Sequence, residues 1–300
     1  MNKISFILHG KHRGNKKLVS QISKTFGTLY ETNFYYTEFA GHAIELATKA
    51  GQENSDYIIA TGGDGTMNEV ANGVMWSGNQ NVKTGLLPYG TGNDFARTMK
   101  VSNDANALKN LIETNSFQKI DLGMVQFKNT EGNDEQRYFI NIADVGLGGF
   151  IAQKLAHSSK WMGAFLTFQR AIFSTFFTYR HQWLQVRADD FIYEGKILSY
   201  IIANGKYFGA GLGIAPDAEP NDGIFEIVMG AEISLWDYVK NMGKVRKCQK
   251  IVHPEMSYSK AREISIKHMT LPIDMDGEFI GYTPMKVSIV PGALQFLCSR

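Results

Sequence analysis

Apolar and polar residues follow two different patterns along this chain of 300 residues. Up to Asp121, short apolar runs alternate with segments whose apolar residues recur every three or four positions, which predicts strands alternating with amphipathic helices. The expected strands are Ile4–Leu8, Phe34–Thr37, Tyr57–Ala60 and one ending at Leu86–Leu87, and the expected helices are Lys16–Phe26, His42–Ala50, Met67–Met75 and one near Phe95. This alternation is typical of a parallel α/β layer, with functional loops after the strand ends.

After Asp121 the pattern changes to short alternating runs separated by turn pairs such as Asn-Gly and Asp-Gly, which predicts a mostly antiparallel sandwich or barrel. The expected strands are Met124–Phe127, Tyr138–Ile142, Trp183–Val186, Leu198–Ala203, Ile224–Met229, Ile264–Lys267 and Met285–Val290, with inserted helices over Ile151–Tyr179 and Leu235–Lys247. We therefore expect an α/β domain over residues 1–121, completed by about the last 15 residues, and a β-rich domain over residues 122–300.

The composition fits an ordinary two-domain protein, with 44% hydrophobic and 20% charged residues. A net charge of +2 is too small to predict nucleic-acid binding, so we expect no nucleic-acid partner and only local basic surfaces. The two cysteines, Cys248 and Cys298, exclude a disulfide framework and indicate a reducing compartment.

No stretch of 18 uninterrupted apolar residues occurs, and the apolar run Ile4–Leu8 passes directly into charged residues, unlike a secretion signal. We expect a cytoplasmic protein that does not span a membrane.

The strongest local signal is the loop over residues 61–69, which reads Thr-Gly-Gly-Asp-Gly-Thr-Met-Asn-Glu. It lies between an apolar strand and a helix, where glycines let the backbone approach a ligand and the helix start attracts an anion. The alternative is a tight turn before a capped helix, because Thr66 and Glu69 have the spacing of a capping box. Three glycines interleaved with Asp64 favour phosphate binding.

A second loop, residues 88–97, reads Pro-Tyr-Gly-Thr-Gly-Asn-Asp-Phe-Ala-Arg and also follows a strand end. Alone, it is equally well explained as a turn with Asn93 or Asp94 as helix N-cap. Its pairing with the first loop favours two walls of one nucleotide site.

Carboxylates also cluster near the C-terminus, at Asp274, Asp276 and Glu278 around Gly277. They fit a hairpin turn, but they also fit a general base for a hydroxyl and a group near Mg²⁺. The spacing alone leaves both interpretations open.

Together, these three motifs resemble the diacylglycerol kinase catalytic-domain family, which includes soluble bacterial lipid kinases and the sphingosine and ceramide kinases. The further matching segments are Asp121-Leu122-Gly123, Phe139-Ile140-Asn141 with Gly146, Asn221-Asp222-Gly223, and Thr37 after an early strand. The resemblance implies an α/β nucleotide domain similar to that of NAD kinases, a β-rich lipid domain, and ATP held between them.

The resemblance also implies roles for individual residues. The expected ATP-binding residues are Thr37, Gly62, Gly63, Asp64, Gly65, Thr66, Met67, Asn68, Thr91 and Asn93. Asp276 or its neighbour Glu278 would be the general base. A structural Mg²⁺ would be held by the carboxylate of Asp222 and the carbonyls of Glu219 and Ile224.

The implied activity is a kinase of phospholipid metabolism that uses ATP and Mg²⁺ to phosphorylate a lipid with a free hydroxyl, with diacylglycerol favoured as acceptor. Such an enzyme would touch the membrane surface transiently, and an oligomer is compatible with the sequence. The aromatic segment Trp161–Trp183 fits an acyl-chain pocket, a membrane contact or an ordinary core helix. The basic residues Lys240, Lys244, Arg246, Lys247 and Lys250 fit either an anionic-lipid contact or a solvated helix face.

Two other functions remain open at this point. One is an NAD kinase or other small-molecule kinase with the same Gly-Gly-Asp-Gly loop; the second glycine loop and the terminal Asp-Gly-Glu argue against it. The other is a nucleotide- or lipid-binding regulator without turnover, against which the retained Asp276 and Glu278 argue.

Overall fold

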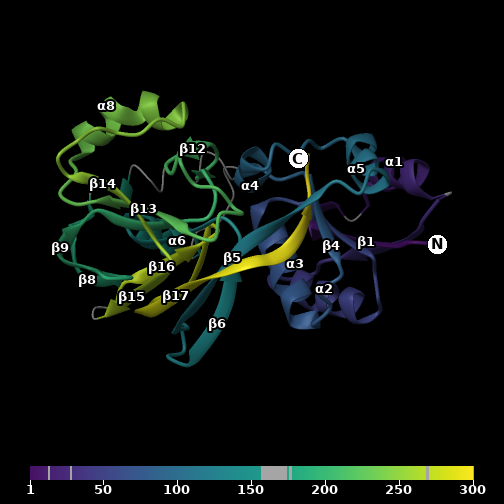
Figure 1. Cartoon of the computed structure of the whole chain (residues 1–300), viewed down its shortest axis with the longest axis horizontal. Coiled ribbons are helices and arrows are strands. Elements are labelled where there is room, and N and C mark those ends of the chain that lie inside the picture. Colours follow the sequence, from purple (N-terminus) through teal and green to yellow (C-terminus); the bar gives the residue numbers. More distant parts are fainter. Residues whose placement is uncertain (13, 28, 157–173, 176–177, 268–269, 300) are drawn as a thin grey trace. The chain divides into compact units, whose positions relative to one another are not determined.

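The structure is a computed structural model that describes all residues except 13, 28, 157–173, 176–177, 268–269 and 300. The chain divides into two compact units (Figure 1). Unit 1 comprises Met1–Asp121 and Gly292–Arg300, and unit 2 comprises Leu122–Pro291.

Unit 1 is built on a parallel sheet in the order β2-β1-β3-β4, to which the end of the long strand β17 adds beside β4. Its strands are β1 (Lys3–Leu8), β2 (Glu31–Tyr36), β3 (Tyr57–Gly62), β4 (Lys83–Pro88) and the end of β17 (Glu278–Leu297). Its helices are α1 (Lys16–Phe26), α2 (His42–Gln52), α3 (Asp64–Ser77), α4 (Asp94–Thr98) and α5 (Ala105–Glu113), with a short 3₁₀ helix at Gly10–His12. The predicted α/β layer is confirmed.

Helices cover both faces of this sheet, as Figure 1 shows for α1 and α5 on one side and α2 and α3 on the other. Leu18 and Ile22 of α1 and Leu108 of α5 pack with one face of the strands in a single apolar cluster. On the other side α2 and α3 approach each other closely at Gly73, which has no side chain. A Cβ there would lie 2.4 Å from the carbonyl oxygen of Ile44. Burial on both faces explains why these strands read as continuous apolar runs.

Unit 2 is predominantly antiparallel, with the strand path β14-β13-β10-β7-β16-β17 continuing through β15 and β8 to β9. Alternate residues of these strands form one large apolar core. The strands are β5 (Phe117–Lys128), β6 (Asp134–Phe139), β7 (Ile142–Gly146), β8 (Gln182–Ala188), β9 (Phe191–Ile197), β10 (Ser199–Ala203), β11 (Tyr207–Phe208), β12 (Leu212–Gly213), β13 (Phe225–Gly230), β14 (Met256–Ala261), β15 (Glu263–Lys267) and β16 (Pro272–Met275). The predicted β-rich domain with inserted helices is confirmed.

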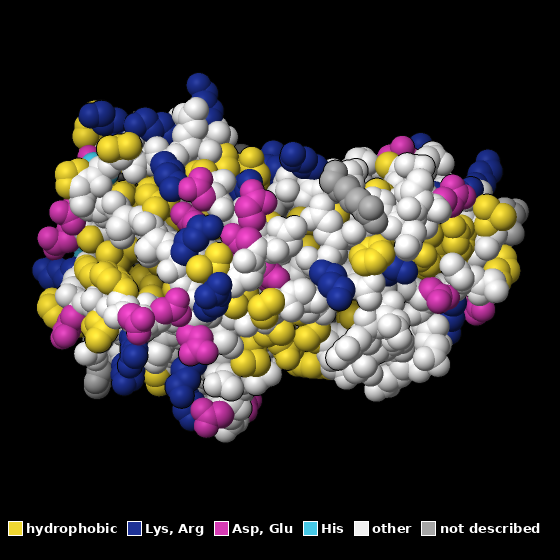
Figure 2. All heavy atoms as spheres, viewed as in Figure 1, with side chains coloured by type: hydrophobic (Ala, Val, Ile, Leu, Met, Phe, Trp, Pro, Cys, Tyr) yellow, Lys and Arg dark blue, Asp and Glu magenta, His cyan; other side chains and the backbone are white. Residues whose placement is uncertain are grey.

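Two helices of unit 2 are described, α6 (Leu147–Ala156) and α8 (Leu235–Arg246). The helix expected over Ile151–Tyr179 starts earlier than predicted, at Leu147. Most of the aromatic segment Trp161–Trp183 lies outside the described residues, so its predicted lipid contact stays a prediction. Basic side chains gather over α8 in Figure 2. None of the helices in the described ranges is both long and apolar enough to cross a bilayer.

The predicted capping box of Thr66 and Glu69 is wrong. Helix α3 begins at Asp64 with Gly63 as N-cap, so Thr66 already lies in its first turn. The Glu69 carboxylate instead accepts hydrogen bonds from the N–H groups of Gly41 and Ala43, at 3.1 and 3.0 Å, around the start of α2. Glu69 therefore ties α3 to α2, where the first-turn N–H groups need acceptors.

Candidate active site

The two glycine loops touch at the ends of β3 and β4. The N–H of Tyr89 donates to the carbonyl of Gly62 at 2.7 Å. A Cβ on Gly90 would lie 2.4 Å from the Cα of Gly63, closer than such atoms can approach. The second loop therefore needs glycine at this crossing, and a Cβ on Gly63 would be tight at 3.1 Å from the Gly90 Cα. The crossing lies at the sheet edge where α/β proteins bind ligands.

A side-chain hydrogen bond between Asp64 and Phe95 also joins the two loops, and we call it the clasp. Asp64 Oδ1 accepts the N–H of Phe95 at 2.9 Å, which joins the start of α3 to α4. Asn93, with a φ of 52°, closes the second loop by accepting from Gly90 N–H and donating to Gly90 carbonyl, both at 2.9 Å. Asn93 is the N-cap residue of α4, as one interpretation predicted, but its side chain bonds within the loop and does not cap the helix.

The start of α3 provides main-chain donors beside this crossing. Its first intrahelical bond runs from Met67 N–H to the Gly63 carbonyl at 3.1 Å. The N–H groups of Asp64, Gly65 and Thr66 precede that bond and have no acceptor within the helix. Such a helix start, in a helix of 14 residues, favours a phosphate group.

The side chains further along α3 point elsewhere. Met67 is fully buried in unit 1, and Asn68 is buried and receives hydrogen bonds from the Asn72 amide. The Thr66 hydroxyl packs back on Gly62, where an added Cβ would lie 2.4 Å away. Of the predicted contacts over residues 62–68, the main-chain N–H groups of residues 64–66 are the part suited to an anion.

Thr37 meets the loop that follows β1. Its hydroxyl accepts the N–H of Gly10 at 2.9 Å, and its own N–H donates to the Leu8 carbonyl at 3.0 Å. The same loop bonds to the end of β3, from His9 N–H to the Thr61 carbonyl at 3.1 Å. Thr37 is thereby linked through the β1 loop to the first glycine loop, whereas Thr91 is exposed on the second loop.

Two buried polar atoms in these loops have no hydrogen-bond partner in the described part of the chain, Thr61 Oγ1 and His12 Nε2. The His12 ring meets the Tyr89 ring edge-on at 5.6 Å. Burial, followed by the charges of Lys11 and His9, lowers the pKa of His12, which favours its neutral form. Buried polar atoms are normally satisfied, so these two fit a polar ligand that completes the site.

The C-terminal carboxylates of unit 2 form a hairpin turn, with positive φ at Asp276 and Gly277. The Asp276 carboxylate accepts three main-chain N–H groups, from Ile140 and Ile142 at 2.8 Å and from Asn141 at 3.0 Å. This side chain fixes the turn to the start of β7.

Glu278 has a different environment. Its side chain is 48% exposed and pairs with Arg137 at 3.1 Å. Of the two predicted bases, Glu278 has the more accessible carboxylate.

Asp274 has a carboxylate partner that the sequence analysis overlooked, the buried Asp144, which is its register partner on the adjacent strands β7 and β16. Burial raises the pKa of Asp144 to about 7. Burial, then the charges of Asp144 and Asp276, raises the pKa of Asp274 well above its usual range. Asp144 Oδ1 is buried without a hydrogen-bond partner among the described residues. The available signal was a charged residue inside the apolar run of β7.

The predicted structural metal site is the turn over residues 219–224. It offers one carboxylate, Asp222, whose Oδ1 accepts the Ile224 N–H at 3.2 Å and whose Oδ2 pairs with Lys260 at 3.1 Å. The Glu219 carbonyl already accepts the Asp222 N–H at 3.4 Å. The metal site expected at this turn stays a prediction. Within the described ranges no group of three His, Cys, Asp or Glu residues could hold a metal ion.

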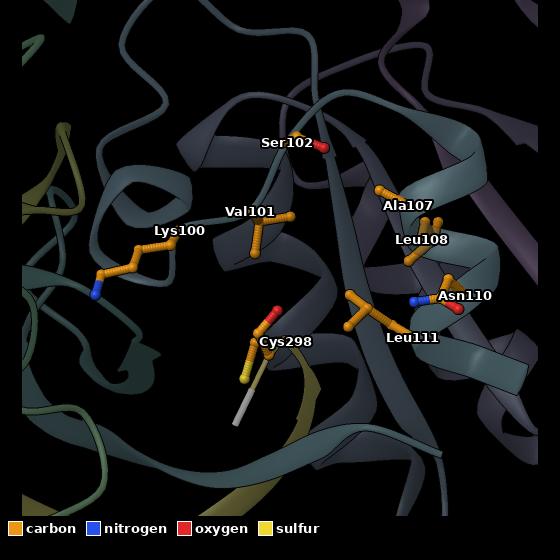
Figure 3. Close-up of a pocket in the computed structure, with 9 residues that line it drawn as sticks. Lys100, Val101, Ser102, Ala107, Leu108, Asn110, Leu111 and Cys298 are labelled. Carbon is orange, nitrogen blue, oxygen red and sulfur yellow. The ribbon is translucent and has the colours of Figure 1, made fainter. Parts of the chain in front are cut away.

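A cavity of about 140 Å³ in unit 1 is separate from these loops (Figure 3). It is lined by the segment before α5, by α5 itself and by the C-terminal residues, including Val101, Leu111 and Cys298. None of the predicted site residues lines it, so we do not assign it to the candidate active site.

Comparisons with known proteins agree with this arrangement. The profile of the diacylglycerol kinase catalytic domain matches residues 3–125, and that of the YegS C-terminal NAD kinase beta sandwich-like domain matches residues 143–298. A diacylglycerol kinase of Staphylococcus aureus (strain bovine RF122 / ET3-1) is 30% identical over 276 residues, or 92% of this chain and 84% of the relative. The diacylglycerol kinase of strain MRSA252 matches to the same extent.

Two crystal structures from Bacillus anthracis str. Sterne share the fold, each covering 99% of this chain and 97% of its own. One is described as a diacylglycerol kinase, with a TM-score of 0.70 at 19% identity. The other has a TM-score of 0.77 at 22% identity. The resemblance and the fold class predicted from the motifs are confirmed. The chain belongs to the diacylglycerol kinase catalytic-domain family, and is therefore a kinase whose family implies ATP as phosphate donor.

Proposed function

We propose that this protein transfers the γ-phosphoryl group of ATP, in the presence of Mg²⁺, to a free hydroxyl of diacylglycerol or a similar lipid. The observation that carries the proposal is the hydrogen bond from Phe95 N–H to the Asp64 carboxylate, which joins the two glycine loops. It holds the N–H groups at the start of α3 beside the second glycine loop. The 30% identity to diacylglycerol kinases supports a lipid acceptor.

Phosphoryl transfer depends mainly on positioning and on neutralising charge, because its transition state is loose. In the proposed complex, the N–H groups of Asp64, Gly65 and Thr66 bind phosphate oxygens, and Thr37 and Thr91 contact the nucleotide. Mg²⁺ bound with ATP would offset charge on the phosphates, held largely by phosphate oxygens and water.

We assign the proton acceptor to Glu278 and a positioning role to Asp276. A general base must accept a proton from the lipid hydroxyl, so its oxygen must be free to approach that group. The Asp276 carboxylate already accepts three main-chain N–H groups, whereas the Glu278 carboxylate is half exposed and has one cationic neighbour, Arg137. Arg137 would hold the Glu278 side chain in place at this position.

The runner-up function is a kinase for a soluble acceptor such as NAD, and the observation behind it is the NAD kinase-like sandwich matched by residues 143–298. One experiment separates the two functions. The purified protein is incubated with γ-labelled ATP and Mg²⁺, and with either a panel of lipids in mixed micelles or NAD. Labelled phosphatidic acid or another labelled phospholipid supports the proposal and names the acceptor. Labelled NADP with no labelled lipid replaces the proposal with the runner-up.

A further inference from the structure

We propose that the outward face of α8 is the surface by which this protein docks on an anionic lipid bilayer. The inference rests on the proposed function, since a lipid acceptor lies in a membrane. The docking face consists of Trp236, Val239, Lys240, Lys244, Arg246 and Lys247.

These residues form one continuous stripe. Trp236, Lys240, Lys244 and Lys247 follow each other at the spacings of three and four that place side chains on one helix face. The opposite face turns inward, where Val245 is buried and Tyr238 packs beside Ile233. Helix α8 therefore has an inner side that packs in unit 2 and an outer side whose residues are exposed.

The apolar part of the docking face is exposed. Trp236 is 74% exposed and Val239 47% exposed, and the two lie one turn apart. Inserting Val239 into an apolar phase would remove apolar surface from water, which is favourable. Tryptophan is enriched where one end of a side chain is apolar and the other is wet, as at a membrane interface.

The charged part of the docking face has a single sign. Four cations lie on this face, although the whole chain has a net charge of only +2. Among the described residues, none of these four side chains takes part in an ion pair; the adjacent Lys250, by contrast, pairs with Asp217.

Asp237 forms a capping box with Ser234 at the start of α8. The Asp237 N–H donates to the Ser234 Oγ at 3.2 Å, and the Ser234 N–H donates to the Asp237 carboxylate at 3.3 Å. Asp237 is the one acidic residue of α8; it also pairs with His253 at 3.6 Å, and its charge acts on Lys240. Four cations against this one carboxylate leave the docking face positively charged. Figure 2 shows basic side chains gathered over α8 with apolar side chains beside them.

A helix that lies in a membrane interface combines an aromatic or aliphatic strip with lysine and arginine. Each basic residue near an anionic surface adds attraction that corresponds to about a fivefold gain in binding. A nucleic acid also attracts cations, but it offers no apolar phase for Val239. The chemistry on this face therefore favours a bilayer rich in anionic phospholipid.

The test measures sedimentation of the full chain with vesicles of phosphatidylcholine, with or without phosphatidylglycerol. We expect binding only to the vesicles that contain phosphatidylglycerol. The double variant Lys240→Gln/Lys244→Gln should weaken that binding about 30-fold. Trp236→Ala should weaken it independently of salt. The matched control, Lys17→Gln/Lys24→Gln on α1, should bind like wild type, and thermal unfolding should confirm that every variant is folded.

Activity separates this inference from the proposed function. The α8 variants should lose phosphorylation of diacylglycerol embedded in vesicles but keep wild-type kcat/KM with a short-chain, water-soluble diacylglycerol. Unchanged vesicle binding in the α8 variants would overturn the docking face while leaving the kinase intact. Vesicle binding through α8 without phosphorylation of any lipid would overturn the proposed kinase function and leave the docking face intact. Tighter α8-dependent binding to a single-stranded oligonucleotide than to vesicles would also overturn the inference.

Discussion

Asp64 and Phe95 connect the two glycine loops of unit 1, because the Asp64 carboxylate accepts the main-chain N–H of Phe95 at 2.9 Å. Asp64 is the first residue of α3, and Phe95 lies fully buried in the first turn of α4. This side-chain hydrogen bond adds to the main-chain bond from Tyr89 N–H to the Gly62 carbonyl in joining two segments that we assign to one nucleotide.

Replacing Asp64 should loosen both loops. Hydrogen bonds to charged groups contribute about 1.5–3 kcal/mol, so Asp64→Ala should lower the free energy of unfolding by about that amount and weaken ATP binding. Asp64→Asn keeps an acceptor oxygen and should lose less of both. Urea unfolding and calorimetric ATP titration measure the two effects. Equal stability and ATP affinity in Asp64→Ala and wild type would contradict the clasp.

Two glycines should respond differently to alanine. Gly90→Ala places a Cβ 2.4 Å from the Gly63 Cα and should reduce both stability and ATP binding. Gly65 has open space around its Cβ position, and alanine stabilises a helix by about 0.5–1 kcal/mol relative to glycine. Gly65→Ala should therefore leave the protein at least as stable, but weaken ATP binding if phosphate approaches the start of α3. Unfolding and ATP titration of the two variants side by side check this, and unaltered ATP affinity in both would argue against the phosphate site.

The roles of Asp276 and Glu278 are separable. Glu278→Gln should lower the rate of lipid phosphorylation by about 10²–10⁴ while leaving stability and ATP affinity near wild type. Asp276→Asn should also lose most activity and still bind ATP, but it should destabilise unit 2, because an amide offers one acceptor oxygen to three N–H donors. Turnover and urea unfolding of both variants measure this. Wild-type turnover in Glu278→Gln would assign the base elsewhere.

The neighbouring carboxyl groups of Asp144 and Asp274 should make stability fall as pH rises. Between about pH 4 and 7 the folded protein keeps a proton on Asp144 that the unfolded chain has released, so each unit of pH costs about 1.4 kcal/mol until the folded pKa of about 7 is passed. The raised pKa of Asp274 acts in the same direction. Asp144→Asn removes one of these protons, so its stability should fall less steeply. Urea unfolding at several pH values compares the two slopes, and parallel curves would show that Asp144 does not carry this dependence.

Much of the fold could be predicted from the sequence because buried elements leave a strong apolar pattern. The predicted helix Lys16–Phe26 coincides with α1. Strands β9 and β14 were not predicted, since each lies at an edge of the sheet with most of its residues partly or fully exposed. The start of α3 was placed too late because glycines conceal a helix start.

The candidate site was only partly predictable for a physical reason. Glycine loops and carboxylate clusters are visible as local motifs, but contacts depend on how strands pair. The pairing of Asp144 with Asp274 requires the register of β7 on β16, and the three N–H groups around Asp276 come from residues far away in the chain. Local spacing contains neither relationship.

The most direct measurement of the central claim is the transfer of label from γ-labelled ATP to diacylglycerol in mixed micelles, by wild type and by Glu278→Gln with matched ATP occupancy. The account predicts Mg²⁺-dependent labelled phosphatidic acid from wild type and a rate lower by about 10²–10⁴ from the variant. Bound ATP with no labelled lipid from wild type would contradict it.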